Sequence, residues 1–230
     1  MNNKKTIIIW VVALLIVIGV IIYILSNKNY KENSAKNENE AKDVLDNSKN
    51  ENTEGETGEN KKLVAYFSVA GEVYNVGTVD VGNTAIMSSY IVDYLKADSF
   101  EIVPVKPYTT IYKDLIEVAK EEQRNNARPE IKNKISNFEE YDTIFIGYPI
   151  WWGDLPPIVY TFLEEYDFSG KTVIPFNTHE GSGISGTYDR IKNKLSNANV
   201  NTNGLALQGK VSRTDDGKSE TINWLKNLGY

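Results

Sequence analysis

Two adjacent tryptophans follow an apolar segment near the middle of the chain. Residues 143–147 read Thr-Ile-Phe-Ile-Gly, and the next seven residues read Tyr-Pro-Ile-Trp-Trp-Gly-Asp. Each indole presents a large flat apolar face, Pro149 restricts the turn, and Gly153 lets the backbone approach another group closely. This pattern predicts a loop that stacks against a flat aromatic ligand. The alternative is that both indoles simply fill the core.

A second loop carries groups that could hold a phosphate. It follows the apolar residues 62–67 and leads into a predicted helix; its small and polar residues are Ser68, Ala70, Gly71, Gly82, Asn83 and Thr84. Hydroxyl groups and the unpaired N–H groups of a helix N-terminus bind phosphate. No Lys or Arg occurs in residues 63–95, so neutral donors would hold the anion. An ordinary N-cap by Asn83 or Thr84 is the alternative.

A third loop follows the apolar residues 171–177 and reads Thr-His-Glu-Gly-Ser-Gly from residue 178 to 183. Its two glycines would expose backbone groups to the edge of a heterocycle. His179 is the only histidine, and the chain has no cysteine and no H-E-x-x-H pattern, so no metal site is expected. No G-x-S-x-G elbow is present either. We therefore expect His179 to be a hydrogen-bonding loop residue rather than a general base.

Predicted strands and helices alternate five times and position these loops. Strands are predicted at residues 62–67, 100–105, 142–148, 171–177 and 200–208. Helices are predicted at residues 83–96, 112–125, 156–166, 185–195 and from 214 or 215 to 228. This order is typical of a three-layer α/β domain with a parallel sheet and right-handed crossovers. Ligands of such sheets lie beyond the carboxyl ends of the strands, where all three loops fall.

These residues resemble the flavodoxin family, and the nearest match is a flavodoxin-like branch with an extended phosphate loop. The matching segments are LVAYFSVAGEVYNVGTVDVGNTA, VPVKPY, AKEEQRNNARPEI, YDTIFIGYPIWWGDLPPIVYTFLEEYDFSGKTVIPFNTHEGSGISGT and GLALQG. The resemblance implies a flavodoxin-like fold, a five-stranded parallel sheet in the order 2-1-3-4-5, and non-covalently bound FMN. About ten inserted residues, Glu72 to Val81, separate Gly71 from Gly82, and Glu72–Asp80 are expected to form a flap.

The resemblance also implies which residues contact FMN. The phosphate would be surrounded by Ser68, Ala70, Asn83 and Thr84. One side of the isoalloxazine would be lined by Pro149, Ile150, Trp151, Trp152 and Gly153. The other side would be lined by Thr178, His179, Glu180, Gly181 and Gly183. No catalytic residue is expected, because the flavin carries the chemistry.

Two redox functions remain open. The first is membrane-tethered electron transfer to a redox partner protein or a small-molecule acceptor. The alternative is an FMN-dependent NAD(P)H:quinone-type oxidoreductase. No G-x-G-x-x-G follows the first strand, which disfavours a dinucleotide bound in the Rossmann manner. The carboxylates nearest the ring loops, Asp154 and Glu180, would disfavour the fully reduced, anionic flavin. A flavin-free binding domain is the third possibility, which the tryptophans and the glycine loop disfavour.

An apolar segment near the N-terminus predicts a membrane anchor. Residues 6–25 contain no charge and are long enough to cross a bilayer as a helix. No A-x-A cleavage pattern follows, so we expect an uncleaved transmembrane helix within residues 1–26. Residues 27–61 are rich in Asn, Glu and Lys and are expected to form a disordered linker. A charged helix of a few turns around residues 41–45 is the alternative. Residues 62–230 would form the FMN-binding domain.

The charges of the chain bear on its partners and its location. Residues 62–230 contain 17 basic and 22 acidic residues, which argues against nucleic acid as a partner. The absence of cysteine excludes disulfides and lipid attachment through a thiol.

The flank before the apolar segment is very short, and such an arrangement usually leaves the following domain outside the cell. We therefore expect a single-pass protein of the cell membrane with an extracytoplasmic domain.

Overall fold

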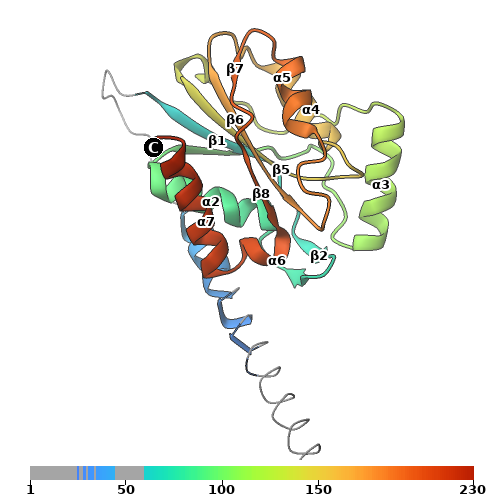
Figure 1. Cartoon of the computed structure of the whole chain (residues 1–230). Helices are drawn as coiled ribbons and strands as arrows, with labels where there is room; N and C mark the ends of the chain where they lie inside the picture. The colour runs from blue at the N-terminus through green and yellow to red at the C-terminus, as the bar shows by residue number, and fades with distance from the viewer. Residues whose placement is uncertain (1–24, 26–27, 30, 34, 45–59) are drawn as a thin grey trace, which may run out of the picture.

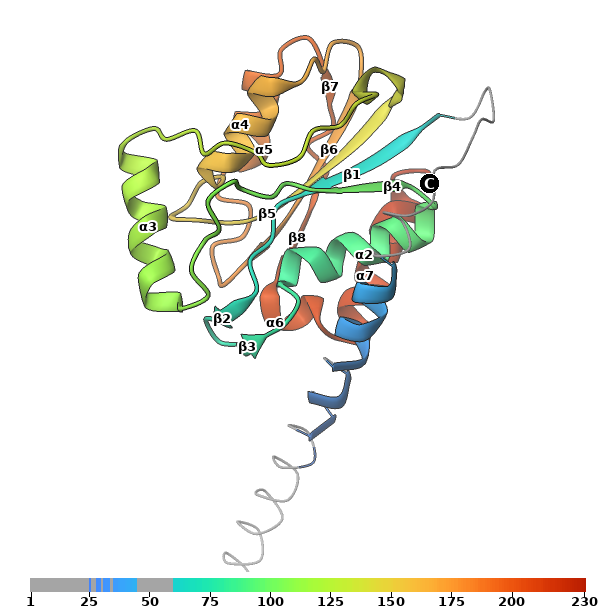
Figure 2. The same cartoon turned by 180° about the vertical axis from the view of Figure 1, so that it is seen from behind.

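A computed structural model describes residues 25, 28–29, 31–33, 35–44 and 60–230. Residues 60–230 form a parallel sheet between two layers of helices (Figures 1 and 2). The sheet consists of β1 (Lys62–Tyr66), β4 (Asp98–Glu101), β5 (Thr143–Pro149), β6 (Thr172–His179), β7 (Asn199–Val200) and β8 (Leu205–Gln208). All of their pairings are parallel. The predicted α/β fold with a parallel sheet is confirmed.

The numbering of the strands in the sheet differs from the predicted 2-1-3-4-5, although the strands that correspond to the predicted ones have the predicted neighbours. Neighbouring strands follow the order β4-β1-β5-β6-β7, and β8 also pairs with β6. One reason is that the predicted strand at residues 200–208 is divided, so that β7 pairs with the first part of β6 and β8 with its last part. The other is an antiparallel hairpin of β2 (Gly71–Val73) and β3 (Gly77–Val79), which lies outside this sheet and precedes β4 in the chain.

Alternate residues of β1 pack into the two layers. Leu63 and Ala65 belong to one core cluster, whereas Val64 and Tyr66 belong to the other. All four are buried, as expected for a strand that is covered on both faces and reads as a continuous apolar segment. The second predicted strand is displaced to β4, because Pro104 leaves the sheet and forms an isolated antiparallel bridge with Ile131.

Helices cover both faces of the sheet. α2 (Asn83–Leu95), the short α6 (Gly209–Ser212) and α7 (Asp215–Asn227) lie on one face, and α4 (Pro157–Glu165) and α5 (Thr187–Lys194) lie on the other (Figure 2). α3 (Tyr112–Arg124) contacts α4 and β2, and a short 3-10 helix, η1 (Phe138–Glu140), precedes β5. Each predicted helix begins and ends within two residues of an observed one. Prolines occupy only the first turn of α4, where they fit without loss of a hydrogen bond.

Residues 35–44 form a helix that packs against the domain beside α7 (Figure 1). Ala41 is fully buried and Asn37 is 1% exposed. For these residues the short-helix alternative holds instead of the disordered linker, and the helix begins before residue 41. The predicted membrane anchor lies outside the described residues, except for its last residue, Leu25. Within the described part of the chain, no helix has the length and apolar character needed to span a membrane.

Candidate functional site

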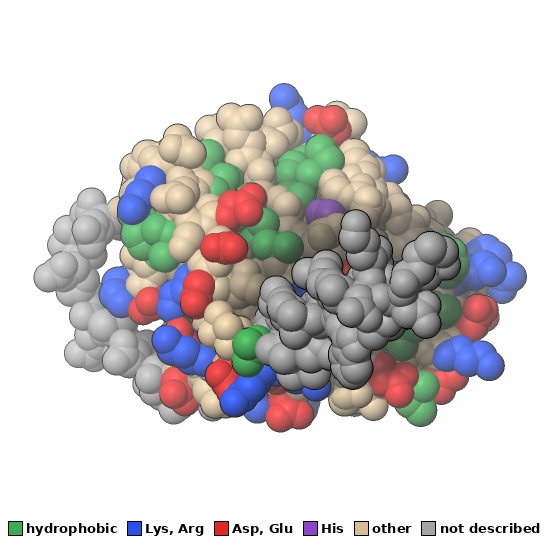
Figure 3. Space-filling model, turned by 60° about the horizontal axis from the view of Figure 1, so that its bottom comes forward, with side chains coloured by type: hydrophobic (Ala, Val, Ile, Leu, Met, Phe, Trp, Pro, Cys, Tyr) green, Lys and Arg blue, Asp and Glu red, His purple; other side chains and the backbone are tan. Residues whose placement is uncertain are grey.

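A cavity of about 380 Å³ lies at the carboxyl ends of β1, β5 and β6. Its lining includes residues from all three predicted loops: Ser68, Asn83, Thr84, Pro149, Ile150, Trp151, Trp152, Gly153, Thr178, His179 and Glu180. Figure 3 shows this end of the molecule, where the histidine lies near exposed apolar side chains. The volume is typical of sites for small organic ligands. The fold thus brings together three loops that are far apart in the sequence.

The N-terminus of α2 lies open at one end of this cavity. The N-cap residue is Gly82, which has no side chain to cap the helix, so an ordinary cap by Asn83 or Thr84 is excluded. The backbone N–H of Ala85 donates to Ser68 Oγ at 3.1 Å. A Cβ at position 82 would lie 2.3 Å from that oxygen, so only glycine permits this close approach. An uncapped helix N-terminus beside a hydroxyl group is suited to an anion.

The two tryptophans have different surroundings. Trp151 packs edge-on against Phe67 at 5.3 Å and Tyr108 at 5.1 Å between ring centroids, as the core-filling alternative predicts. Trp152 is 54% exposed, and its Nε1 donates to the carbonyl of Ile116 in α3 at 3.0 Å. Both residues line the cavity. Trp152 is therefore the indole with more surface left for a ligand.

A tight turn presents Trp152 to the cavity. Trp151 and Asp154 exchange two backbone hydrogen bonds of 3.0 Å. The φ angles of the residues between them are 49° for Trp152 and 74° for Gly153, and positive values at both positions are typical of a type I′ turn. A left-handed conformation costs a non-glycine residue about 1–2 kcal/mol. Such strain concentrates at functional sites.

Asp154 braces this turn and does not line the cavity. Its Oδ1 accepts hydrogen bonds from the Tyr160 hydroxyl at 2.9 Å and from the N–H of Leu155 at 2.8 Å. The same oxygen lies 3.4 Å from Nη1 of Arg190, which also donates to the carbonyl of Gly153 at 3.1 Å. The expectation that Asp154 acts on a ring in the cavity is therefore not supported.

The third loop places an imidazole and a carboxyl group at the cavity. His179 Nδ1 accepts a hydrogen bond from the N–H of Gly181 at 3.0 Å, which agrees with a hydrogen-bonding role. Burial lowers the pKa of His179, which favours the neutral form of the ring. Burial also raises the pKa of Glu180 to about 7, although a hydrogen bond from the Gly209 backbone opposes this shift. Among the described residues, no group of His, Asp and Glu is arranged to hold a metal ion.

Three of the predicted contact residues do not line the cavity. Ala70 precedes the hairpin, and Gly181 and Gly183 shape the third loop instead. The carbonyl of Gly183 accepts a hydrogen bond from Asn177 Nδ2 at 3.1 Å. The first and third loops are joined by Thr84 and Thr178, whose hydroxyl oxygens are 2.8 Å apart.

The structure adds lining residues that the sequence did not predict. They come mainly from the β2–β3 hairpin and α3: Val69, Glu72, Val73, Tyr74, Tyr112, Leu115, Ile116, Ala119 and Ser182. The rings of Tyr74 and Tyr112 stack at 5.9 Å, and Glu72 Oε2 accepts a hydrogen bond from the N–H of Tyr112 at 3.0 Å. The lining residues of the hairpin could have been predicted, because they belong to the insertion that was expected to form a flap. The lining residues of α3 could not, because their distance from the three loops depends on tertiary packing.

A parallel α/β sheet with a cavity at the carboxyl ends of its strands defines a cofactor-binding domain of the doubly wound type. A family model described as Flavodoxin matches residues 61–228. The chain belongs to the flavodoxin family.

Solved structures of flavoproteins resemble this chain. A protein classed as a flavoprotein from Bacteroides eggerthii DSM 20697 is 31% identical, with a TM-score of 0.60, over 75% of this chain and 99% of that one. A similar protein from Bacteroides uniformis ATCC 8492 is 31% identical, with a TM-score of 0.58, over 74% and 99%. A flavoprotein in complex with FMN from Lactobacillus acidophilus NCFM shares the fold, with 22% identity and a TM-score of 0.51 over 72% and 99%. No curated protein matches the chain.

Proposed function

We propose that this protein binds FMN and transfers electrons while residues 6–25 tether it to the cell membrane. The observation that carries the proposal is the single cavity formed by three separate loops, with an uncapped helix N-terminus at one end and Trp152 in its lining. These groups fit the phosphate and the planar ring of FMN. The FMN complex of the Lactobacillus acidophilus flavoprotein, which shares the fold, is consistent with this choice of cofactor.

Each part of the cavity has a distinct role in the proposed site. Ser68, Asn83 and Thr84 would hold the phosphate at the start of α2, where the helix dipole favours negative charge. Trp152 would cover one face of the ring, and the apolar side chains of α3 would exclude water from it. The flavin supplies the redox chemistry when bound. The protein residues orient it and set its electrostatic surroundings.

The cellular setting is part of the proposal and rests on the sequence alone. The uncharged segment at residues 6–25 would cross the membrane, with the FMN-binding domain on the extracytoplasmic side. Its partner would be a redox protein or a small-molecule electron acceptor. A tether raises the effective concentration of partners at the same membrane. This favours an electron carrier over the quinone-type oxidoreductase, because a carrier must meet its redox partners repeatedly.

The first test is the visible absorption spectrum of the purified full chain after FMN has been added and unbound FMN removed. We expect a protein-bound flavin spectrum and, on stepwise anaerobic reduction with dithionite, a one-electron stage. Direct two-electron reduction by NAD(P)H would favour the quinone-type oxidoreductase instead. A colourless protein that retains no FMN would exclude both functions.

A pair of serine variants tests whether the predicted end of the cavity holds the phosphate. Ser68→Ala removes the hydroxyl group beside the start of α2 and should weaken FMN binding severalfold, because it removes a hydrogen-bonding group at the phosphate. Ser169→Ala changes an exposed serine in the turn before β6 and should leave the affinity unchanged. Equal affinities for all three proteins would show that the phosphate binds elsewhere.

A further inference from the structure

The docked helix, residues 35–44, reaches the main chain that leads into α2. Glu38 Oε1 accepts hydrogen bonds from the backbone N–H groups of Asp80 at 2.6 Å and Val81 at 2.7 Å. Two residues later, Asn83 begins α2 and lines the cavity. Glu38, which precedes the predicted domain in the sequence, therefore holds residues 80–81 in place. These residues lead directly into the N-terminus of α2 at the end of the cavity.

A buried arginine joins Glu38 to the same segment by a second route. Arg213 is fully buried, and its Nη2 donates to Glu38 Oε2 at 2.5 Å. Its Nη1 donates to the carbonyl of Val81 at 2.9 Å and to Asn83 Oδ1 at 3.1 Å. The side chain of Asn37 completes the contact by donating to the carbonyl of Arg213 at 3.0 Å. The helix, Arg213 and residues 80–83 thus form one hydrogen-bonded unit.

This unit keeps the N-terminus of α2 open. Asn83 is the first residue of α2, and its side-chain oxygen accepts a hydrogen bond from Arg213 rather than from a backbone N–H of the helix. A Cβ at Gly209 would lie 2.0 Å from Asn83 Nδ2, so the other end of the amide is enclosed as well. The backbone N–H groups of Asn83 and Thr84 remain available to an anion, whereas that of Ala85 donates to Ser68 Oγ. Arg213 lies behind a loop that has no Lys or Arg of its own, and Glu38 balances its charge.

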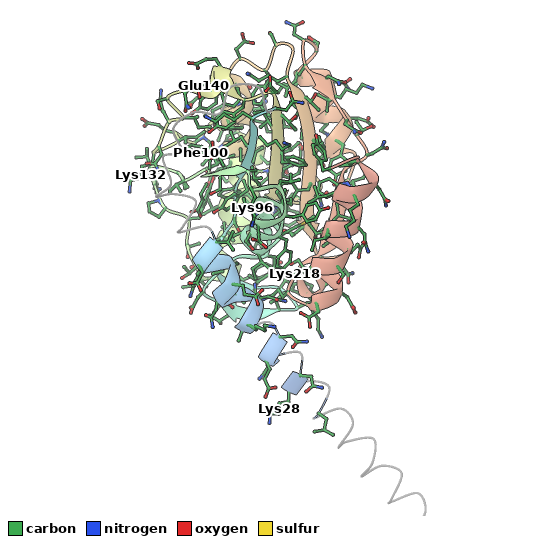
Figure 4. All side chains as sticks on the ribbon, turned by 90° about the vertical axis from the view of Figure 1, so that its left-hand side faces the viewer. Lys28, Lys96, Phe100, Lys132, Glu140 and Lys218 are labelled. Carbon is green, nitrogen blue, oxygen red and sulfur yellow. The ribbon has the colours of Figure 1, made fainter. Side chains whose placement is uncertain are left out.

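We propose that Glu38 and Arg213 are positioning residues for the phosphate end of the FMN site, so that docking of helix 35–44 sets the affinity for FMN. This inference rests on the proposed function and extends it, because it makes the N-terminal segment part of the cofactor site. Figure 4 shows where this helix meets the domain beside Lys218 of α7, whereas Lys28 lies beyond the domain. A change in the docking of the helix would be transmitted to the cofactor through Glu38.

The test compares the affinities of the full chain, kept in detergent, for FMN and for riboflavin, which lacks the phosphate. Glu38→Ala should weaken FMN binding about tenfold, a coupling of ordinary size between linked sites, and change riboflavin binding less than about twofold. Glu38→Gln retains an oxygen that can accept from the 80–81 backbone and should recover part of the FMN affinity. Riboflavin binding by each variant also shows that the pocket is folded.

The matched control is Glu40→Ala, on the same helix. Glu40 pairs with Lys218 at 2.7 Å, so the variant loses a contact with the domain without touching residues 80–83. Its ratio of FMN to riboflavin affinity should equal that of the wild type. The inference is overturned if Glu38→Ala leaves this ratio unchanged, raises the FMN affinity, or lowers both affinities equally, while the proposed function still stands. A wild-type chain that binds no FMN would overturn both.

Discussion

At the residue scale, Glu180 is a carboxyl group whose charge the fold disfavours. Burial at the edge of the cavity raises its pKa to about 7 from an ordinary value of 4.5. Its charge also contributes to the raised pKa of Tyr112, which lines the same cavity. Glu180 can therefore be neutral or charged beside the proposed flavin within the physiological range of pH. A neutral carboxyl would tolerate a negative charge on the ring better than a carboxylate would.

The same shift predicts how stability depends on pH. Because the pKa of Glu180 is higher in the folded state, the stabilising contribution of its proton is complete below about pH 4.5 and is lost as pH rises through about 7. Glu180→Gln cannot ionise, so this variant should match the wild type near pH 4.5. At pH 8 it should exceed the wild type by about 1–2 kcal/mol, a figure reduced for partial solvent exposure. Urea unfolding across this pH range measures the difference, and a constant difference would contradict the prediction.

Residues of the site differ in how well they could be predicted from the sequence. The tryptophan loop and the glycine loop follow apolar strands directly, so their place at the sheet edge follows from the order of elements. The different surroundings of Trp151 and Trp152 depend on Phe67, Tyr108 and Ile116, which belong to other segments. The pairing of Arg213 with Glu38 joins residues 175 positions apart, and no local pattern predicts it.

At the element scale, the turn at residues 151–154 combines strain with exposure. Asparagine followed by glycine is the preferred pair in type I′ turns, whereas this turn has tryptophan at that position. The indole gains one hydrogen bond, to Ile116, and lies 5.6 Å from the Lys120 ammonium. The strained backbone and exposed ring of Trp152 do not favour stability of the fold. They are better explained if the ring contacts a bound ligand in the cavity.

Trp152→Asn separates these two contributions. Relief of backbone strain should offset the lost hydrogen bond, so the free energy of unfolding without FMN should stay within about 1 kcal/mol of the wild type. The affinity for FMN should fall about tenfold or more, because stacking on an aromatic side chain contributes about 1–3 kcal/mol per base. Trp152→Phe keeps an aromatic face and should retain most of the affinity. Calorimetric titration and urea unfolding measure the two effects; an unchanged affinity would show that Trp152 does not stack on the ring.

Elements buried in the two cores were predicted best, since apolar periodicity reports burial. The β2–β3 hairpin was predicted only as a flap, because it pairs with itself and contacts the rest of the domain through Thr110 and Tyr112, which are distant in the sequence. Helix 35–44 was predicted only as an alternative, around residues 41–45, because its sequence has few apolar residues. Polar contacts to the buried Arg213 stabilise it instead.

At the scale of the whole molecule, net negative charge opposes the approach of FMN. The chain carries a formal charge of −6, and a phosphate monoester carries about −1.5 to −2 at pH 7. The association rate constant for FMN should therefore rise a few-fold between low and physiological salt, because salt screens the repulsion. Uncharged riboflavin should show no such dependence. Stopped-flow measurements of FMN binding at several salt concentrations test this prediction, and an association rate constant that falls with salt would contradict it.

The docked helix lies at the same end of the sheet as the cavity, and residues 28–29 and 31–33 extend beyond the domain at that end (Figures 1 and 4). If residues 6–25 are embedded as the sequence predicts, the end of the sheet that carries the cavity would lie nearer the membrane than the opposite end. Reactants dissolved in the bilayer or bound to its surface would then reach the cavity more easily than solutes from the bulk. The orientation of the domain would thus select among possible electron donors and acceptors.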